Sequence, residues 1–326
     1  MKVFITGGAG FIGSHLAETL LANGHQVLVL DDLSTGQIAN IDPLIGRPGF
    51  DYRIGSVMDA PLVGELVDRC DVTVHLAAAV GVRLIVERPV HTIETNVHGT
   101  EVVLRAAARK SKPVLIASTS EVYGKSERFP FSEADDLVMG STAHSRWAYA
   151  CSKALDEWLA LAYYREKGLP VIIARFFNTV GPRQTGRYGM VLPNFARAAL
   201  AGEPIRVFGT GDQSRCFAHV ADVTESVYRL LRTPAAYGGV FNIGNDEEVS
   251  INQLAERVRD AAGSTSPIVH VPYEEAYAGG FEDMNRRVPD VSKLERTIGF
   301  RPHTPLSRII ADVLAYERAS AELVTA

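Results

Sequence analysis

Thr6-Gly7-Gly8-Ala9-Gly10-Phe11-Ile12-Gly13 follows the apolar run Lys2–Ile5 and opens an amphipathic stretch. Three glycines at spacing three, between a strand pattern and a helix pattern, form the dinucleotide-binding fingerprint in its G-x-x-G-x-x-G variant. The first glycine permits a tight turn, the second admits a pyrophosphate to the backbone, and the third lets helix and strand pack closely. Ordinary loop glycines are the alternative. The cofactor-binding residues predicted here are Gly7, Gly10, Phe11, Ile12 and Gly13.

Acidic and small residues at the ends of the next strand patterns complete this expectation. Asp31 and Asp32 close the second strand, where a carboxylate accepts hydrogen bonds from ribose hydroxyls and repels a 2'-phosphate. NAD is therefore favoured over NADP. Asp59, after the third strand, either caps the following helix or approaches the adenine amine. Ala77 lies among small residues after the fourth strand, which allow the cofactor close contact.

Short β-branched runs alternate with longer amphipathic stretches through the first half of the chain. The predicted strands are Lys2–Ile5, Gln26–Leu30, Tyr52–Gly55, Val72–Leu76, Val114–Ser118 and Val171–Phe176. The predicted helices are Phe11–Asn23, Pro61–Arg69, Val90–Arg109 and His144–Lys167. Strands separated by helices imply right-handed crossovers and a parallel sheet covered on both faces. The sequence therefore predicts an α/β fold with a doubly wound parallel sheet, the Rossmann architecture.

The alternation ends after Gly181, and glycines and prolines are dense from there to Phe217. This density predicts loops and short helices around a pocket. Val240–Ile243 indicates a return to the sheet, and an amphipathic helix is expected near Leu306–Tyr316. We expect two interleaved lobes: an NAD-binding lobe of residues 1–178 and 218–250, and a smaller nucleotide-sugar-binding lobe of residues 179–217 and 251–326.

Composition narrows the classes of function. Hydrophobic residues make up 46% of the 326 residues, charged residues 22%, and the net charge is -5. A mildly acidic chain without a long Lys/Arg run is not expected to bind nucleic acid. The three cysteines and nine histidines lack disulfide or metal spacing, so we expect no metal and a reducing, cytoplasmic compartment. No export signal and no apolar run of about 18 residues is visible, so no membrane partner is expected.

Tyr149-Ala150-Cys151-Ser152-Lys153 is a Y-x-x-x-K motif on a predicted helix. A spacing of four puts both side chains on one helical face, so the ammonium can lower a phenol pKa that is otherwise about 10. An exposed helical pair is the alternative. A catalytic role is favoured because Ser118-Thr119-Ser120-Glu121 ends the preceding strand. The carboxyl ends of strands in doubly wound sheets face the ligand crevice.

With these motifs in place, the sequence resembles the extended short-chain dehydrogenase/reductases, a family of nucleotide-sugar epimerases, dehydratases and decarboxylases. TGGAGFIGS, HLAA, TSEVYG, YACSK, RFFNTVGPR and VFGTGDQSRCFAHVADV occur in family order over nearly the whole chain. The resemblance implies NAD as cofactor, a nucleotide sugar as substrate, and Thr119, Tyr149 and Lys153 as the hydride-transfer triad. The substrate-binding residues that it implies are Ser120, Asn178, Arg183 and Arg215, with Val207 and Phe208 beside the nucleotide base.

Two further likenesses bear on the reaction. A 4,6-dehydratase of this family carries an acidic Asp where this chain has Ser120, so the acid for dehydration is missing. Ser120-Glu121 instead resembles UDP-glucuronic acid decarboxylases, in which the hydroxyl meets the sugar carboxylate and the Glu takes part in the chemistry. The segment Tyr277–Asp290 resembles their R-x-P segment and implies Arg287 as the catalytic arginine. In epimerases the corresponding arginine binds only diphosphate.

We therefore predict an NAD-dependent UDP-glucuronic acid decarboxylase that oxidises C4, loses carbon dioxide from C6 and gives a UDP-4-keto-pentose, UDP-xylose or both. Its catalytic residues are Thr119, Glu121, Tyr149, Lys153 and Arg287. The alternatives are a 4-epimerase of UDP-glucose or UDP-glucuronate with the same triad, and an NAD-binding regulator without turnover. The intact triad disfavours the regulator.

Aromatic residues on the second long helix suggest an oligomer. Trp147, Trp158 and Leu159 either lie in the core or join helix Val90–Arg109 in the four-helix seam common in this family. We favour a homodimer through that seam.

Overall fold

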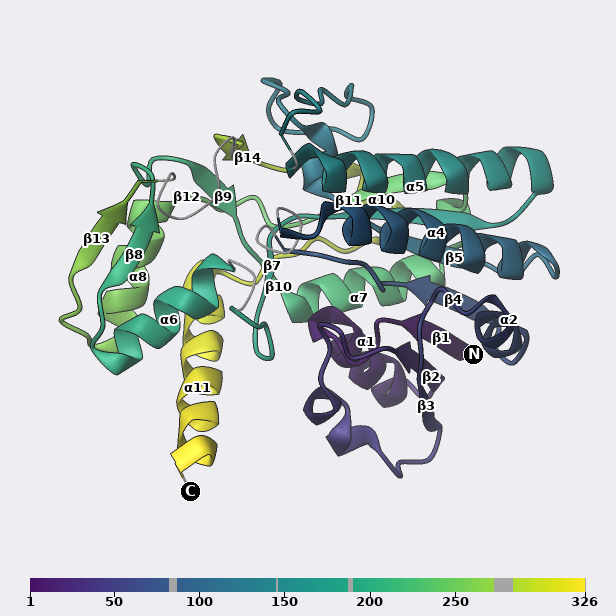
Figure 1. Ribbon diagram of the computed structural model, residues 1–326, viewed down its shortest axis with the longest axis horizontal. Coiled ribbons are helices and arrows are strands. Elements are labelled where there is room, and N and C mark those ends of the chain that lie inside the picture. Colours follow the sequence, from purple (N-terminus) through teal and green to yellow (C-terminus); the bar gives the residue numbers. More distant parts are fainter. Residues whose placement is uncertain (82–86, 145, 187–189, 273–283, 326) are drawn as a thin grey trace.

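Seven parallel strands form the central sheet of the computed structural model, in the order β11-β6-β5-β4-β1-β2-β3 (Figure 1). They are β1 Lys2–Thr6, β2 Gln26–Asp31, β3 Phe50–Ile54, β4 Val72–His75, β5 Val114–Thr119, β6 Val171–Phe176 and β11 Gly239–Ile243. The structure describes residues 1–81, 87–144, 146–186, 190–272 and 284–325. The doubly wound parallel sheet predicted from the alternating pattern is confirmed.

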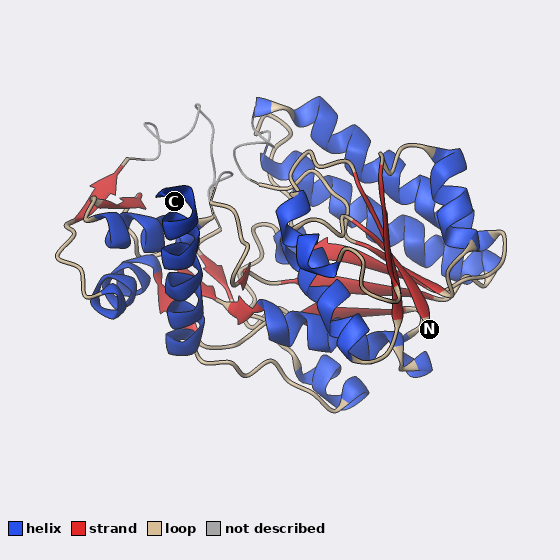
Figure 2. Cartoon of the chain, turned by 90° about the horizontal axis from the view of Figure 1, so that it is seen from below, coloured by secondary structure: helices blue, strands red, loops and turns tan. Residues whose placement is uncertain are grey.

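Helices cover both faces of this sheet (Figure 2). The helices are α1 Phe11–Ala22 and α7 Val220–Leu231 on one face, and α2 Ala60–Asp68, α4 Pro89–Ala108 and α5 Arg146–Lys167 on the other. Alternate residues of a strand point to opposite faces. Val29 of β2 therefore packs in the same cluster as Leu16 of α1, whereas its neighbour Leu30 packs with Leu66 of α2. Burial on both faces explains the continuous apolar runs of these strands.

A second group of elements lies beside the carboxyl ends of the sheet, at the left of Figure 1. Its helices are α6 Val191–Ala201, α8 Ile251–Ala262 and α11 Leu306–Thr325, and its parallel strands are β8 Ile205–Phe208 and β13 Ile268–Val271. They share a core cluster that includes Phe195, Val207, Leu254 and Ile310. Smaller pairings join β7 Thr179–Val180 to β10 Ala218–His219, and β9 Ser214–Cys216 to β12 Glu248–Ser250 and β14 Arg286–Arg287.

Several helices depart from the sequence expectations. The expected loops and short helices of residues 181–217 include the 11-residue helix α6. Helices α7, α8 and α10 (Ser292–Ile298) were not predicted, and α11 continues past Tyr316 to Thr325. The glycines mark helix ends: Gly202 and Gly263 stand in the left-handed conformation directly after α6 and α8. Ser250 and Gln253 form a capping box at the start of α8, a signal that was present in the sequence.

None of the helices in the part of the chain that the structure describes combines the length and hydropathy that a membrane span requires.

Candidate active site

A cavity of about 510 Å³ opens where the strands of the central sheet end and the second group of elements begins. This is the position that ligands take in open α/β sheets. Predicted site residues that line it are Gly7, Gly10, Phe11, Ile12, Gly13, Asp31, Asp32, Ala77, Thr119, Ser120, Glu121, Tyr149, Lys153, Asn178, Phe208, Arg215 and Arg287. Side chains from distant parts of the sequence therefore surround one space.

Gly7 and Gly13, at the junction of β1 and α1, leave no room for a side chain. Gly7 has a φ of 72°, and its amide donates to the Leu30 carbonyl at 2.8 Å. A Cβ atom on Gly13 would lie 2.3 Å from the Gly7 carbonyl oxygen, which no real structure tolerates. At Gly10 the nearest atom to such a Cβ is the same oxygen, at 3.1 Å. The turn is thus a tight, side-chain-free cradle at a helix N-terminus, which fits a pyrophosphate.

The acidic residues that follow β2 and β3 take different positions. The Asp31 carboxylate accepts hydrogen bonds from the amides of Ala9 and Leu33, both at 2.9 Å, and its burial raises its pKa. Asp32 accepts from the Ser34 amide at 3.0 Å and lines the cavity. Asp59 instead caps α2, because its carboxylate accepts from the Leu62 amide at 3.0 Å. Of the two roles left open for Asp59, the structure shows the helix cap, and Asp31 and Asp32 line the cavity instead.

The phenol of Tyr149 stands at the centre of the catalytic cluster. Burial raises its pKa well above the usual range, the Glu121 charge raises it further, and a hydrogen bond with Thr119 opposes the shift. Lys153 lines the same cavity, and its ammonium lies 2.7 Å from the Asp156 carboxylate. The lysine expected to activate the tyrosine therefore has a carboxylate partner that sequence reasoning missed.

An ion pair lies beside this tyrosine. Glu121 follows β5 in the short helix η3 (Ser120–Tyr123), and its carboxylate lies 3.3 Å from the Arg287 guanidinium of β14. Both side chains are largely buried. Ser120 is fully buried next to Glu121. The structure thus places an acid, an arginine and a hydroxyl together at one end of the cavity.

The residues expected around the nucleotide are only partly placed as predicted. Asn178 donates to the Cys216 carbonyl at 3.0 Å, and Arg215 donates to the Ser214 carbonyl at 2.7 Å, while both line the cavity. Val207 was expected to contact the cavity, but it does not line it. It points into the core, and its strand neighbours Arg206 and Phe208 line the cavity instead, because successive side chains alternate across β8.

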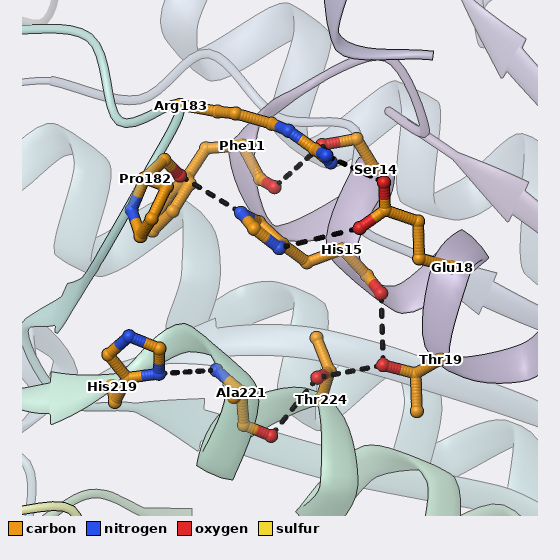
Figure 3. Close-up of polar contacts among 10 residues, drawn as sticks. All are labelled: Phe11, Ser14, His15, Glu18, Thr19, Pro182, Arg183, His219, Ala221 and Thr224. Carbon is orange, nitrogen blue, oxygen red and sulfur yellow. Dashed lines mark hydrogen bonds and ion pairs between the residues drawn. The ribbon is translucent and has the colours of Figure 1, made fainter. Parts of the chain in front are cut away.

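Arg183 is the second misplaced residue. Figure 3 shows its guanidinium lying along α1, 2.6 Å from the Glu18 carboxylate and 3.3 Å from the Ser14 hydroxyl. His15, one turn before Thr19, hydrogen-bonds the Pro182 carbonyl at 2.9 Å. Arg183 has a φ of 69°, in the left-handed region. Its side chain therefore fastens this segment to α1, and the expected substrate contact of Arg183 is corrected.

Other cavity residues carried no motif. They include His91, Thr95, Gln184, Thr185, Asn194 and Arg206. Gln213 also lines the cavity, and it lies in the quoted motif VFGTGDQSRCFAHVADV without having been predicted as a site residue. Arg206 could have been found from strand alternation beside Val207. The first part of the segment Tyr277–Asp290, residues 277–283, lies outside the described residues. Within the ranges that the structure describes, no group of three or more His, Cys, Asp or Glu could hold a metal ion.

A dinucleotide cradle and a Thr-Tyr-Lys cluster in one cavity define a class of enzymes that oxidise or isomerise their substrates through a nicotinamide cofactor. A model of the NAD dependent epimerase/dehydratase family matches residues 3–244. The chain belongs to this family, and NAD is its cofactor, as the second-strand carboxylates predicted.

Curated relatives are similar over almost the whole chain. UDP-N-acetyl-alpha-D-glucosaminuronate decarboxylase of Bacillus cytotoxicus is 42% identical over 97% of this chain and 98% of its own length. UDP-glucuronic acid decarboxylase 1 of Xenopus tropicalis is 34% identical over 98% of this chain and 73% of its own length. UDP-glucuronic acid 4-epimerase of Bacillus cereus, solved with UDP-glucuronic acid and NAD, superposes with a TM-score of 0.89 at 26% identity, covering 98% of this chain and 100% of that one.

Proposed function

We propose that this protein is an NAD-dependent UDP-glucuronic acid decarboxylase. The observation that carries the proposal is the Glu121–Arg287 ion pair beside Tyr149 in the cavity. The triad alone is common to several reactions, whereas this pair offers groups for a substrate carboxylate and for a proton. The names of the curated relatives in Bacillus cytotoxicus and Xenopus tropicalis support the same reaction type.

Bound NAD supplies a hydride acceptor for C4 of the sugar and a donor for its return. Tyr149 accepts the proton of the 4-hydroxyl, and Thr119 and Lys153 orient and polarise this exchange. The resulting 4-ketone is β to the C6 carboxylate. The C5–C6 bond then breaks, its electron pair enters an enolate, and carbon dioxide leaves. A proton on C5 completes the balance.

We propose that Glu121 and Arg287 control the loss of carbon dioxide and the protonation of C5. An ionised Glu beside a substrate carboxylate is electrostatically unfavourable. Arg287 offsets the repulsion because its guanidinium can contact both carboxylates. Loss of carbon dioxide moves the negative charge of the substrate carboxylate to the enolate, and protonation at C5 then removes it. Glu121 and Arg287 then place the proton, or its water, at C5. Ser120, buried beside them, offers its hydroxyl to the carboxylate.

For the rest of the substrate we propose that Asn178 and Arg215 bind the diphosphate region and that Phe208 lies beside the base. Their common support is that all three line the cavity on the side of β8 and β9. Arginine suits phosphate because its planar donors match the oxygens.

A second candidate substrate is the 2-acetamido analogue, UDP-N-acetylglucosaminuronic acid. The observation that favours it is the 42% identity with the Bacillus cytotoxicus decarboxylase named for that sugar. The enzyme alternative from the sequence, a 4-epimerase, uses the same triad but needs the keto sugar to rotate and accept hydride on its other face.

Parallel incubations with three substrates distinguish the decarboxylase, its two candidate substrates and the epimerase. The protein is given NAD with UDP-glucuronic acid, its 2-acetamido analogue or UDP-glucose. Mass spectrometry of the products detects loss of carbon dioxide, and proton NMR distinguishes C4 epimers, which have equal mass. We expect loss of carbon dioxide from UDP-glucuronic acid. Interconversion of C4 epimers without carbon dioxide would instead establish the epimerase, and turnover of the acetamido sugar alone would transfer the proposal to that substrate.

Variants then test the ion pair. Glu121→Gln and Arg287→Ala should suppress carbon dioxide release by orders of magnitude while UDP binding changes little. Arg287→Ala should also weaken UDP-glucuronic acid more than UDP-glucose, since only the former offers a carboxylate. Arg286→Ala is the matched control, because that exposed neighbour pairs with Glu248. Equal weakening of both ligands would mark Arg287 as a diphosphate anchor.

We further propose the interleaved lobes of residues 1–178 and 218–250, and of 179–217 and 251–326, as the NAD and sugar parts. Support comes from the separate core cluster built by α6, α8 and α11. Leu294 of α10 packs instead with the sheet cluster, so this short helix bridges the division.

A homodimer through α4 and α5 is proposed as well. Exposed apolar side chains recur at helical spacing on both helices: Val90 and Ile93 on α4, and Leu155 and Trp158 on α5. Trp147, in contrast, is buried in a core cluster, and Leu159 packs against another. A cytoplasmic location is proposed on the three cysteines, which are all free thiols.

A further inference from the structure

Asp156 is a buried acid directly behind the proposed catalytic lysine. It lies on α5, three residues after Lys153 and seven after Tyr149. Its carboxylate Oδ2 is 2.7 Å from the Lys153 Nζ, and the residue is 0% exposed. Lys153 reaches the cavity from the same helix. The ammonium is therefore held between the cavity and a fully buried carboxylate.

The neighbouring residues Glu157 and His75 do not substitute for Asp156 as the charged partner of Lys153. Glu157, next in sequence, is compensated by Arg175 of β6 through two hydrogen bonds of 2.9 and 2.7 Å. His75 of β4 lies near Lys153, but burial lowers its pKa to about 3, so it is neutral at working pH. Thr100 of α4, whose hydroxyl lies 3.1 Å from the His75 Nε2, and Lys153 both oppose the burial that raises the pKa of Asp156.

We propose that Asp156 is a positioning residue that fixes the Lys153 ammonium in the active site and moderates the effect of its positive charge on Tyr149. The inference rests on the proposed roles of Tyr149 and Lys153 in hydride transfer. It does not depend on whether carbon dioxide is subsequently lost.

The charges around Tyr149 set the direction of the effect. Glu121 of η3 and Asp156 of α5 raise the pKa of Tyr149, beside the larger effect of burial, while Arg287 of β14 and the Thr119 hydrogen bond lower it. A carboxylate paired with an ammonium cancels much of its field at a third group. Without the Asp156 charge, the Lys153 ammonium acts on Tyr149 unopposed. The tyrosinate then forms at lower pH.

Asp156→Asn tests this with little change of shape. The rate of NADH formation from NAD and UDP-glucuronic acid is measured in single turnovers as a function of pH, by stopped-flow absorbance. We expect the acid limb of the profile to move down by about one pH unit. Asp156→Glu, which keeps the charge, should bring the limb back toward the wild type. Glu166→Gln, an exposed change of equal charge on the same helix, should leave it in place.

A purely structural role would lower the rate equally at every pH and leave the midpoint unchanged, and that result overturns the inference. Thr100→Val is the second variant, should Asp156→Asn not fold. The Thr100 hydroxyl favours the charged form of Asp156, so its loss should move the acid limb in the same direction by a smaller amount. An acid limb that does not move in Thr100→Val also overturns the inference. Carbon dioxide release with unmoved profiles defeats this inference alone. Shifted profiles without carbon dioxide defeat only the decarboxylase proposal.

Discussion

Asp31 and Asp32 are adjacent residues whose carboxylates have different roles beside the proposed cofactor site. Asp31 satisfies two backbone amides, those of Ala9 and Leu33, and so connects the glycine-rich turn to the end of β2. Asp32 accepts hydrogen bonds from the amide and the hydroxyl of Ser34 in its own loop. Loss of the first carboxylate leaves buried donors unpaired, whereas loss of the second does not.

We therefore expect Asp31→Ala to lower the free energy of unfolding by about 1–3 kcal/mol and to weaken NAD. Asp32→Ala should raise the NAD dissociation constant with stability nearly unchanged. Thermal unfolding and calorimetric titration measure the two effects. Unchanged NAD binding in both variants would refute the view that these carboxylates hold the ribose.

At this scale the sequence predicted residues that belong to motifs and missed those that do not. The fingerprint glycines, Thr119, Tyr149 and Lys153 line the cavity because strand ends and helix faces follow from local pattern. Val207 and Arg183 were misplaced because strand register and a left-handed turn decide where a side chain points. Asp156 stands in no motif, and its contact with Lys153 becomes visible only when the buried face of α5 is known.

The β1–α1 turn is the element on which we expect NAD binding to depend. A Cβ on Gly13 would meet the Gly7 oxygen at 2.3 Å and the Gly8 Cα at 2.7 Å, both rigid backbone. Gly10 tolerates a methyl far better, with one contact at 3.1 Å, but faces the cavity. Gly13→Ala should therefore cost several kcal/mol of stability, about 3 or more by analogy with severe overpacking.

Gly10→Ala is the matched comparison for that change. It should fold with a stability close to the wild type and yet bind NAD at least tenfold more weakly, because the methyl occupies the approach of the pyrophosphate. Chemical denaturation and NAD titration of the two variants give the answer. A stable Gly13→Ala variant with normal NAD affinity would contradict the packing described for this turn.

Elements of the sheet were predictable, and elements of the second group were less so. Runs such as Val171–Phe176 are buried on both faces and bear an unmistakable strand pattern. Helices α6 and α8 are amphipathic and each is followed directly by a glycine, so the turn signals around them outweighed the periodicity inside them. The two-residue strand β14 depends entirely on its pairing with β9, which local sequence does not encode.

The cavity as a whole is a product of long-range pairing. Glu121 and Arg287 are 166 residues apart in sequence and meet at 3.3 Å because β14 adds to β9 beside the end of β5. Resemblance to known motifs indicated both residues individually. Only the fold shows that they form a pair, and it is this pairing that distinguishes the proposed decarboxylase site from a bare hydride-transfer triad.

The surface of α4 and α5 is the remaining feature of the whole molecule that calls for a partner. Trp158 is 62% exposed and Leu155 46% on α5, and Val90 is 67% exposed and Ile93 43% on α4, the long helix beside it in Figure 1. A second copy that packs the same two helices against them would bury both sets of apolar side chains in a four-helix seam.

Trp158→Glu should convert the dimer to a monomer in sedimentation velocity, because two charges would meet at the two-fold axis without partners. Val269→Glu, an equally drastic change of an exposed apolar residue on the distant strand β13, should leave the mass unchanged. A wild type that sediments as a monomer at micromolar concentration would exclude the seam, and an unchanged dimer in Trp158→Glu would place the interface elsewhere.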